Sequence, residues 1–177
     1  MIPLYIIGLL QRYGPQHGYQ IKKIIGEQLS DFTQIKLPTI YYHLENMEAN
    51  GLLMATRLKP GGRPEKTVYN VTSKGRQAFQ SMLDELLEFD YHPSFVSDGI
   101  FYFSDSLSLS DMTKGLENHI KNLKEIIERI QKHQNETLQF VPEEMKPMVL
   151  IIFNHHLYHY RAELDWAVES LSVLKGE

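Results

Sequence analysis

The chain has 177 residues, of which 42% are apolar and 23% are charged, so it can form one large or two small globular domains and lacks the composition of a disordered chain. It has no cysteine, which excludes disulfides and thiolate metal sites and favours a cytoplasmic location. No apolar run reaches the roughly 18 residues that a membrane-spanning helix needs, so no membrane partner is expected.

The net charge of −4 is divided unevenly along the chain. Residues 1–76 carry ten Lys and Arg against five Asp and Glu, a net +5, whereas residues 77–177 carry eight against seventeen, a net −9. Phosphate binding depends on local positive charge and not on the total. The first part therefore has the charge of a nucleic-acid-binding head on an acidic body that contacts other partners.

The first two predicted helices cover residues 2–13 and 18–29. Residues 2–13 are apolar on so many sides that we expect this helix to pack against two partners at once. The helix at 18–29 has one inner stripe, formed by Ile21, Ile24, Ile25 and Leu29.

A third helix is predicted from Pro38, whose fixed φ suits a first helical position, to a C-terminal glycine, Gly51. Residues 52–59 and 66–72 are predicted strands, and the segment Pro-Gly-Gly-Arg-Pro at 60–64 turns the chain between them. The apolar face of the third helix is formed by Ile40, Leu44 and Met47. Three helices followed by a hairpin are the plan of a winged helix-turn-helix.

The second part of the chain is predicted to be helical. A helix capped by Thr72 or Ser73 runs to about Phe89, residues 91–93 form a hinge, and the pattern of 95–103 permits a helix or a strand. A long helix to about residue 135 has a nearly heptad seam, formed by Met112, Leu116, Ile120, Leu123, Ile127 and Ile130. The last helix, 143–174, has a stripe formed by Val149, Ile152, Phe153, His156, Tyr160, Leu164, Ala167, Leu171 and Leu174.

These elements predict a mainly α fold with a small β-hairpin wing, in the α+β class. Residues 1–90 form a winged helix-turn-helix DNA-binding domain, and residues 93–177 form an antiparallel helical domain for dimerisation and effector sensing. Two long helices joined by a short loop cannot bury both of their faces alone, so a homodimer is expected.

The exposed side of the third helix carries polar and aromatic residues that do not belong to its apolar face: Thr39, Tyr42, His43 and Asn46. Asparagine can pair with adenine through two hydrogen bonds, and threonine can contact the thymine methyl group. Tyr41 borders the apolar face, and its hydroxyl can reach a phosphate. We interpret these residues as DNA-binding, and the alternative is a solvated helix face without a ligand.

Arg63 stands at the tip of the predicted turn, where one guanidinium suits a narrow and electronegative minor groove. Candidate phosphate contacts of lower rank are Lys66, Lys36, Lys22 and Tyr19. The expected partner is double-stranded DNA with a palindromic operator, because a dimer presents its two recognition helices about 34–36 Å apart.

The last predicted helix carries two further candidate sites. Its aromatic and histidine side chains can line a pocket for a planar aromatic effector or can form dimer core: Phe153, His156, Tyr160 and Trp166. His155, His159 and Glu163 recur every four residues, a spacing that permits a zinc ion and hence a metal-responsive regulator. Packing is the favoured alternative to that metal site, and no cofactor is expected.

An enzyme is not expected, because the sequence has no P-loop, glycine-rich dinucleotide motif, nucleophile elbow or convincing triad. A winged helix used only for protein contacts, as an interaction adaptor, is the other alternative. A salt-dependent DNA-binding assay distinguishes that adaptor from a regulator.

Four stretches resemble the PadR family of bacterial transcriptional regulators: 9–21, 39–53, 61–76 and 155–171. The residues that carry the resemblance occur in a fixed order as Gly18-Tyr19, Tyr41-x-x-Leu44, Tyr69-x-x-Thr72-x-x-Gly75 and Glu163-x-x-Trp166. The resemblance implies a winged helix, a C-terminal dimerisation part of the longer two-helix subtype, and a helix at 95–103. It also implies a homodimeric repressor released by a small molecule, a phenolic acid in the namesake case.

Overall fold

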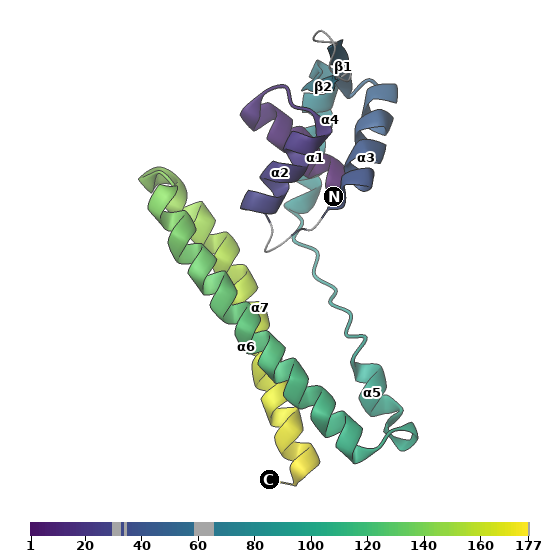
Figure 1. Cartoon of the computed structure of the whole chain (residues 1–177), viewed down its shortest axis with the longest axis vertical. Coiled ribbons are helices and arrows are strands. Elements are labelled where there is room, and N and C mark those ends of the chain that lie inside the picture. The colour runs from purple at the N-terminus through teal and green to yellow at the C-terminus, as the bar shows by residue number, and fades with distance from the viewer. Residues whose placement is uncertain (30–32, 34, 59–65, 177) are drawn as a thin grey trace. The chain divides into compact units, whose positions relative to one another are not determined.

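A computed structural model describes residues 1–29, 33, 35–58 and 66–176 of the chain. The first of two units, Met1–His92, contains α1 (Ile2–Tyr13), α2 (Gly18–Gln28), α3 (Leu37–Ala49), β1 (Leu53–Leu58), β2 (Lys66–Val71) and α4 (Ser73–Leu86) (Figure 1). The second, Pro93–Glu177, contains α5 (Asp98–Tyr102), η1 (Ser104–Ser106), α6 (Leu109–Phe140), η2 (Glu143–Met145) and α7 (Lys146–Lys175). The mainly α fold with a β-hairpin wing is therefore confirmed.

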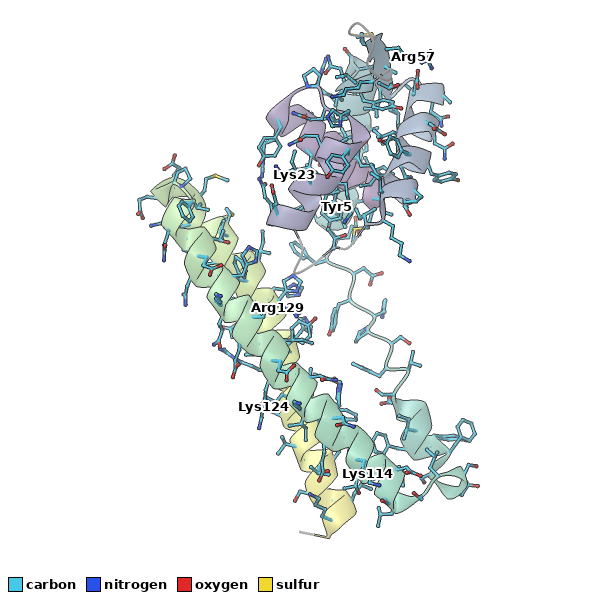
Figure 2. All side chains as sticks on the ribbon, viewed as in Figure 1. Tyr5, Lys23, Arg57, Lys114, Lys124 and Arg129 are labelled. Carbon is cyan, nitrogen blue, oxygen red and sulfur yellow. The ribbon has the colours of Figure 1, made fainter. Side chains whose placement is uncertain are left out.

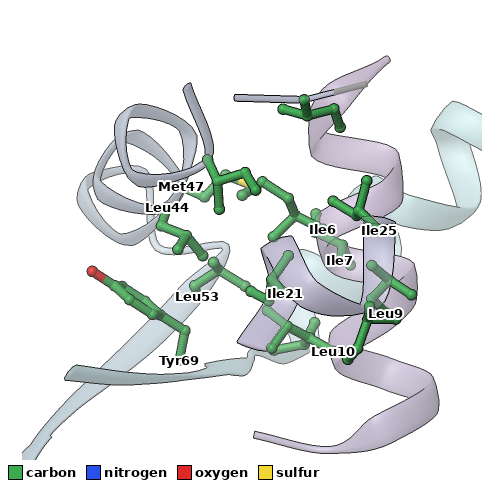
Figure 3. Close-up of a cluster of buried hydrophobic side chains, with 14 residues drawn as sticks. Ile6, Ile7, Leu9, Leu10, Ile21, Ile25, Leu44, Met47, Leu53 and Tyr69 are labelled. Atoms are coloured by element: carbon green, nitrogen blue, oxygen red, sulfur yellow. The ribbon is translucent and has the colours of Figure 1, made fainter. Parts of the chain in front are cut away.

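The core of the first unit lies between α1, α2, α3 and the hairpin (Figure 3). Its fully buried side chains include Ile6, Ile7, Leu10, Ile21, Ile25, Ile40 and Leu44. Helix α1 contacts α3, α4 and β2, which confirms that it packs against more than one partner. Burying each large aliphatic side chain contributes about 1.5–3 kcal/mol, so this cluster is the main source of stability of the unit.

The joint between the hairpin and α4 is built around the backbone of Leu52. Thr72 caps α4, because its Oγ1 accepts from the Gly75 amide at 3.0 Å and lies 3.0 Å from the Leu52 carbonyl oxygen. The Thr72 amide also donates to that carbonyl, at 3.1 Å. A Cβ on Gly75 would lie 2.2 Å from the same oxygen, so this close approach requires glycine.

The hairpin is held against the chain before α2 as well as by its own ladder. Strands β1 and β2 are antiparallel, with Leu53 opposite Val71 and Leu58 opposite Lys66. Gln16 exchanges two backbone hydrogen bonds with Tyr69, of 2.9 and 3.2 Å. Tyr69 is buried, and its hydrogen bonds to Gln16 place β2 beside the segment that leads into α2.

Helices α6 and α7 lie side by side in the second unit (Figure 1). Polar contacts between them include the His119–Glu163 pair at 3.0 Å and the Lys175–Glu117 pair at 2.9 Å. The buried side chains of the seam are Leu116, Leu123, Ile127, Ile130, Phe153, Leu157 and Ala167. No helix in the described part of the chain combines the length and the apolar character that a membrane span requires.

Several predicted boundaries differ from the structure. Helix α4 ends at Leu86, three residues earlier than expected, and Phe89 beyond it has a left-handed φ of 48°. In 95–103 only Asp98–Tyr102 is α-helical. Helix α6 continues to Phe140, because residues 116–141 contain no glycine or proline. It ends there because Val141 precedes Pro142, and helical geometry is disfavoured for the residue before a proline.

The predicted stripe of α7 is wrong at one position. Ile152 is 43% exposed, whereas Leu157, which the stripe omits, is buried. Phe153, Leu157 and Leu164 follow spacings of four and seven, so Leu157 continues the seam and Ile152 falls beside it.

Replacing Gly75 by alanine is expected to lower the free energy of unfolding of the first unit by about 1–3 kcal/mol, because the new Cβ overlaps a backbone oxygen. Urea unfolding followed by circular dichroism measures this change. The matched control is Gly115→Ala on α6, where nothing lies within 4 Å of an added Cβ. That control should stabilise by about 0.5–1 kcal/mol or be neutral, and equal effects of the two substitutions would contradict the close-packed joint.

Candidate nucleic-acid interface

Helix α3 buries one side and presents another. Ile40, Leu44 and Met47 are buried. The residues on the other side of the helix face away from the core, and we call them the α3 outer face: Thr39, Tyr42, His43 and Asn46. Tyr42 is 62% exposed and Asn46 is exposed, while Thr39 and His43 are half-buried. The rings of Tyr42 and His43 meet edge to face, with their centroids 5.3 Å apart. The predicted base-reading residues therefore share one accessible surface.

The start of α3 adds positive charge to this surface. Helix α3 begins at Leu37, with Pro38 in its first turn and Lys36 as the residue before it. Lys36 is exposed and makes no side-chain cap, and the amides of a first helical turn favour an anion. Lys36 and the N-terminal amides of α3 can therefore attract the same phosphate.

Tyr41 belongs to a second surface. A Cβ on Gly18 would lie 2.6 Å from Cε1 of Tyr41, so the tyrosine ring packs directly over the first residue of α2. This contact joins α2 and α3, which together with β2 line an open hollow of about 450 Å³. The lining residues of the hollow are His17, Tyr19, Tyr41, Glu45, Lys66, Thr67 and Tyr69. Three predicted phosphate contacts, from three different elements, are thus brought together.

The hollow has mixed electrostatics. His17 caps α2 by accepting the Gln20 amide at Nδ1, at 3.2 Å, so the positive end of α2 opens here next to exposed Lys66. Glu45 supplies a carboxylate that repels phosphate from its side. Burial raises the pKa of the Tyr69 hydroxyl, and the charges of Glu48 and Glu45 raise it further, so this hydroxyl stays protonated as a donor. A phosphate is therefore favoured toward the α2 and Lys66 side.

Sequence analysis did not single out Arg57, which stands exposed on β1 (Figure 2). Its Nη2 atom lies 4.0 Å from Oε1 of Glu48 on α3, so it partly neutralises one of the two acids of the helix. The signal available in the sequence was the position of this basic residue within a predicted strand of the wing. Lys74 and Arg76 serve the fold instead, because they donate to the backbone oxygens of Asn50 and Val71, at 2.9 and 3.2 Å.

The remaining predicted DNA contacts are less well placed or are not described. Lys22 is half-buried on α2 and does not line the hollow. Arg63 lies in the segment 59–65, outside the described residues.

The proposed effector residues on α7 pack mainly into the second unit. Phe153 is 8% exposed and meets the ring of His133 edge to face at 5.5 Å. Trp166 meets Phe101 of α5 edge to face at 5.8 Å, and Tyr160 is half-buried between the two apolar clusters of the unit. His156 is half-buried. Of these side chains, Phe153 is the one that lies in the core itself.

The three-residue metal site is wrong. Oε1 of Glu163 lies 3.0 Å from Nε2 of His119, across the α6–α7 seam, whereas the Nε2 atoms of His155 and His159 lie 3.2 Å from each other. Across residues 1–29, 33, 35–58 and 66–176, no group of three or more His, Cys, Asp or Glu side chains is arranged to hold a metal ion.

The fold is similar to solved structures over nearly its whole length. Bacillus subtilis PadR in complex with operator DNA has a TM-score of 0.74 at 21% identity, covering 97% of this chain and 98% of that one. The same protein with p-coumaric acid has a TM-score of 0.69 at 23% identity, covering 98% and 96%. The Vibrio cholerae virulence activator AphA has a TM-score of 0.79 at 18% identity, covering 99% of each chain.

At these identities the structural similarity establishes the fold alone, and no curated protein sequence matches this chain. Residues 6–81, which span the buried core, α3, the hairpin and most of α4, match the model of the transcriptional regulator PadR-like family. Over these residues the chain is therefore similar to the PadR-like family of transcriptional regulators.

Proposed function

We propose that this protein is a homodimeric, sequence-specific DNA-binding repressor of the bacterial cytoplasm, released from its operator by a small aromatic effector. The observation that carries the proposal is the α3 outer face, which is accessible beside a hairpin that carries Arg57 and Lys66. A similar fold has been solved on operator DNA, in Bacillus subtilis PadR.

The α3 outer face reads the bases in the major groove. Asn46 can pair with adenine, Thr39 can contact a thymine methyl, and the ring of Tyr42 can contact base edges. His43 is held beside Tyr42 by its edge-to-face contact and supports the position of that ring.

Phosphate contacts position the helix in the groove. Lys66 and Tyr19 bind one phosphate at the open end of α2, with the Tyr41 hydroxyl nearby in the same hollow. Lys36 binds a second phosphate at the start of α3, and Lys22 is a weaker candidate. Arg63 enters the minor groove from the wing, a proposal that rests on its place in the sequence.

A second copy covers the side of α7 that faces away from α6. This side, which we call the α7 outer face, exposes Met148, Ile151 and Tyr158, at 56%, 61% and 65%. Their spacing of three and seven places them on one stripe, opposite the buried Phe153 and Leu157. Apolar stripes of this kind favour helix pairing between subunits.

The effector acts through the second unit, near His156, Tyr160 and Trp166 at the edge of the α6–α7 core. The solved complex of Bacillus subtilis PadR with p-coumaric acid supports a phenolic ligand. Such a ligand lowers operator affinity if it binds more tightly to a dimer whose recognition helices no longer match successive grooves. AphA is named as an activator, so a promoter reporter is needed to establish the sign of regulation.

Substitutions of base-contacting and of phosphate-contacting residues are expected to have different effects on DNA binding. Asn46→Ala should reduce discrimination between operator and random DNA, costing about 1–3 kcal/mol on the operator. Lys66→Ala and Arg63→Ala should weaken both DNAs and lower the slope of log K against log salt by about one. Fluorescence anisotropy on DNA from upstream of the gene, in a salt titration, measures both effects.

The control for these variants is Lys121→Ala, which removes a charge from the exposed side of α6 beside Glu125. It should leave the salt slope unchanged. Absence of salt-dependent binding by the wild type would favour the protein-interaction adaptor instead.

The double substitution Ile151→Arg/Tyr158→Arg is expected to convert the dimer into a monomer, because it buries two charges in the proposed interface. Sedimentation equilibrium at micromolar concentration measures the mass, and circular dichroism checks that helicity is kept. Asn118→Arg/Asn122→Arg, at exposed positions of α6, is the charge-matched control and should remain dimeric. A monomeric wild type, or a double variant that stays dimeric, would contradict this interface.

p-Coumaric acid is expected to lower operator affinity and to change the emission of Trp166, the single tryptophan of the chain. A coupling of about 1–3 kcal/mol corresponds to a change of roughly 5–150-fold, and operator DNA must weaken the ligand by the same factor. Anisotropy and tryptophan fluorescence, corrected for absorption by the ligand, measure the two directions. If no compound in a panel of phenolic acids and planar cations moves both signals, the effector proposal fails.

A further inference from the structure

Two histidines on one turn of α7 have the geometry of a chelate. The Nε2 atoms of His155 and His159 lie 3.2 Å apart, and the ring planes cross at 87°. Both side chains are exposed, so an ion can reach them from solvent. Their separation of four residues places them one above the other on the helix.

We propose that His155 and His159 form a bidentate site for a divalent transition-metal ion such as Zn²⁺, Ni²⁺ or Cu²⁺. Zinc binds imidazole nitrogen at about 2.0–2.1 Å, and two such bonds at a tetrahedral angle place the nitrogens about 3.3 Å apart. The observed separation of 3.2 Å agrees with that edge, so the two nitrogens already lie at chelating distance and the rings need only turn to direct both lone pairs at the ion.

The donor set determines which ions bind. Neutral imidazole suits zinc, copper and nickel, whereas magnesium and calcium prefer oxygen ligands. The metal-free contact is a hydrogen bond in which one ring donates Nε2–H to the other. Metal binding needs both Nε2 lone pairs, so the donor ring carries its proton on Nδ1 instead.

The pair supplies two ligands, and water or other groups complete the coordination sphere. Both histidines come from the same helix, so the chelate forms within a single chain. Its two protein ligands are therefore supplied without DNA and without a second copy. Met148, Ile151 and Tyr158 lie on the same α7 outer face, so in the proposed dimer the open coordination positions are turned toward the second copy.

Calorimetric titration of the untagged full chain with Zn²⁺ and Ni²⁺ tests the site, with Mg²⁺ as the ion that should not bind. His155→Gln and His159→Gln should each weaken binding at least about tenfold, because the second ligand binds from the same molecule at high effective concentration. His92→Gln removes an exposed histidine from the first unit and should leave the affinity unchanged.

A relocated pair separates chelation from histidine content. His159→Gln/Arg161→His keeps the number of histidines but places the second ring six residues from His155, on another side of α7. It should bind as weakly as His159→Gln. If the relocated variant or either single variant binds like the wild type, or if the wild type binds no more tightly than a lone histidine, the site is overturned.

Discussion

The winged unit depends on the backbone of a single residue, Leu52, at which α3, the hairpin and α4 meet. Its amide donates to the Met47 carbonyl at 2.8 Å, at the end of α3, and its own carbonyl accepts from Thr72. That carbonyl oxygen lies so close to Gly75 that residue 75 has no room for a side chain. Because the backbone of one residue contacts the end of α3, Thr72 and Gly75, the angle between α3 and the wing is determined by backbone contacts, which adjust less readily than surface side chains.

Helix α3 separates two tasks by direction. Its outer face turns Tyr42 and Asn46 to solvent, while Tyr41, one residue earlier in the turn, lies over Gly18 and enters the hollow. The charge is distributed to match, since Arg57 offsets Glu48 and the α2 end offsets part of the effect of Glu45. In the proposed function, base reading and phosphate positioning therefore fall to different sides of the same short helix.

In the second unit, each of the two long helices buries only one of its sides. The α6–α7 seam buries Leu123, Ile130 and Leu157, but two helices can cover only one side of each other. Helix α7 consequently keeps an apolar outer face, and the His155–His159 pair lies within it. The same side of one helix therefore carries both the proposed contact to a second copy and the proposed metal chelate.

Local sequence patterns were sufficient to predict α1, α3, the hairpin and the seam of α6, because apolar spacing and turn residues are both read over neighbouring positions. The outer face of α3 followed from the same pattern. Tertiary structure alone decided that Tyr19, Tyr41 and Lys66 share one hollow and that Glu163 pairs with His119 and does not complete a zinc site. These outcomes depend on close approaches between residues distant in sequence, such as Gly18 to Tyr41, and local periodicity carries no information about such distances.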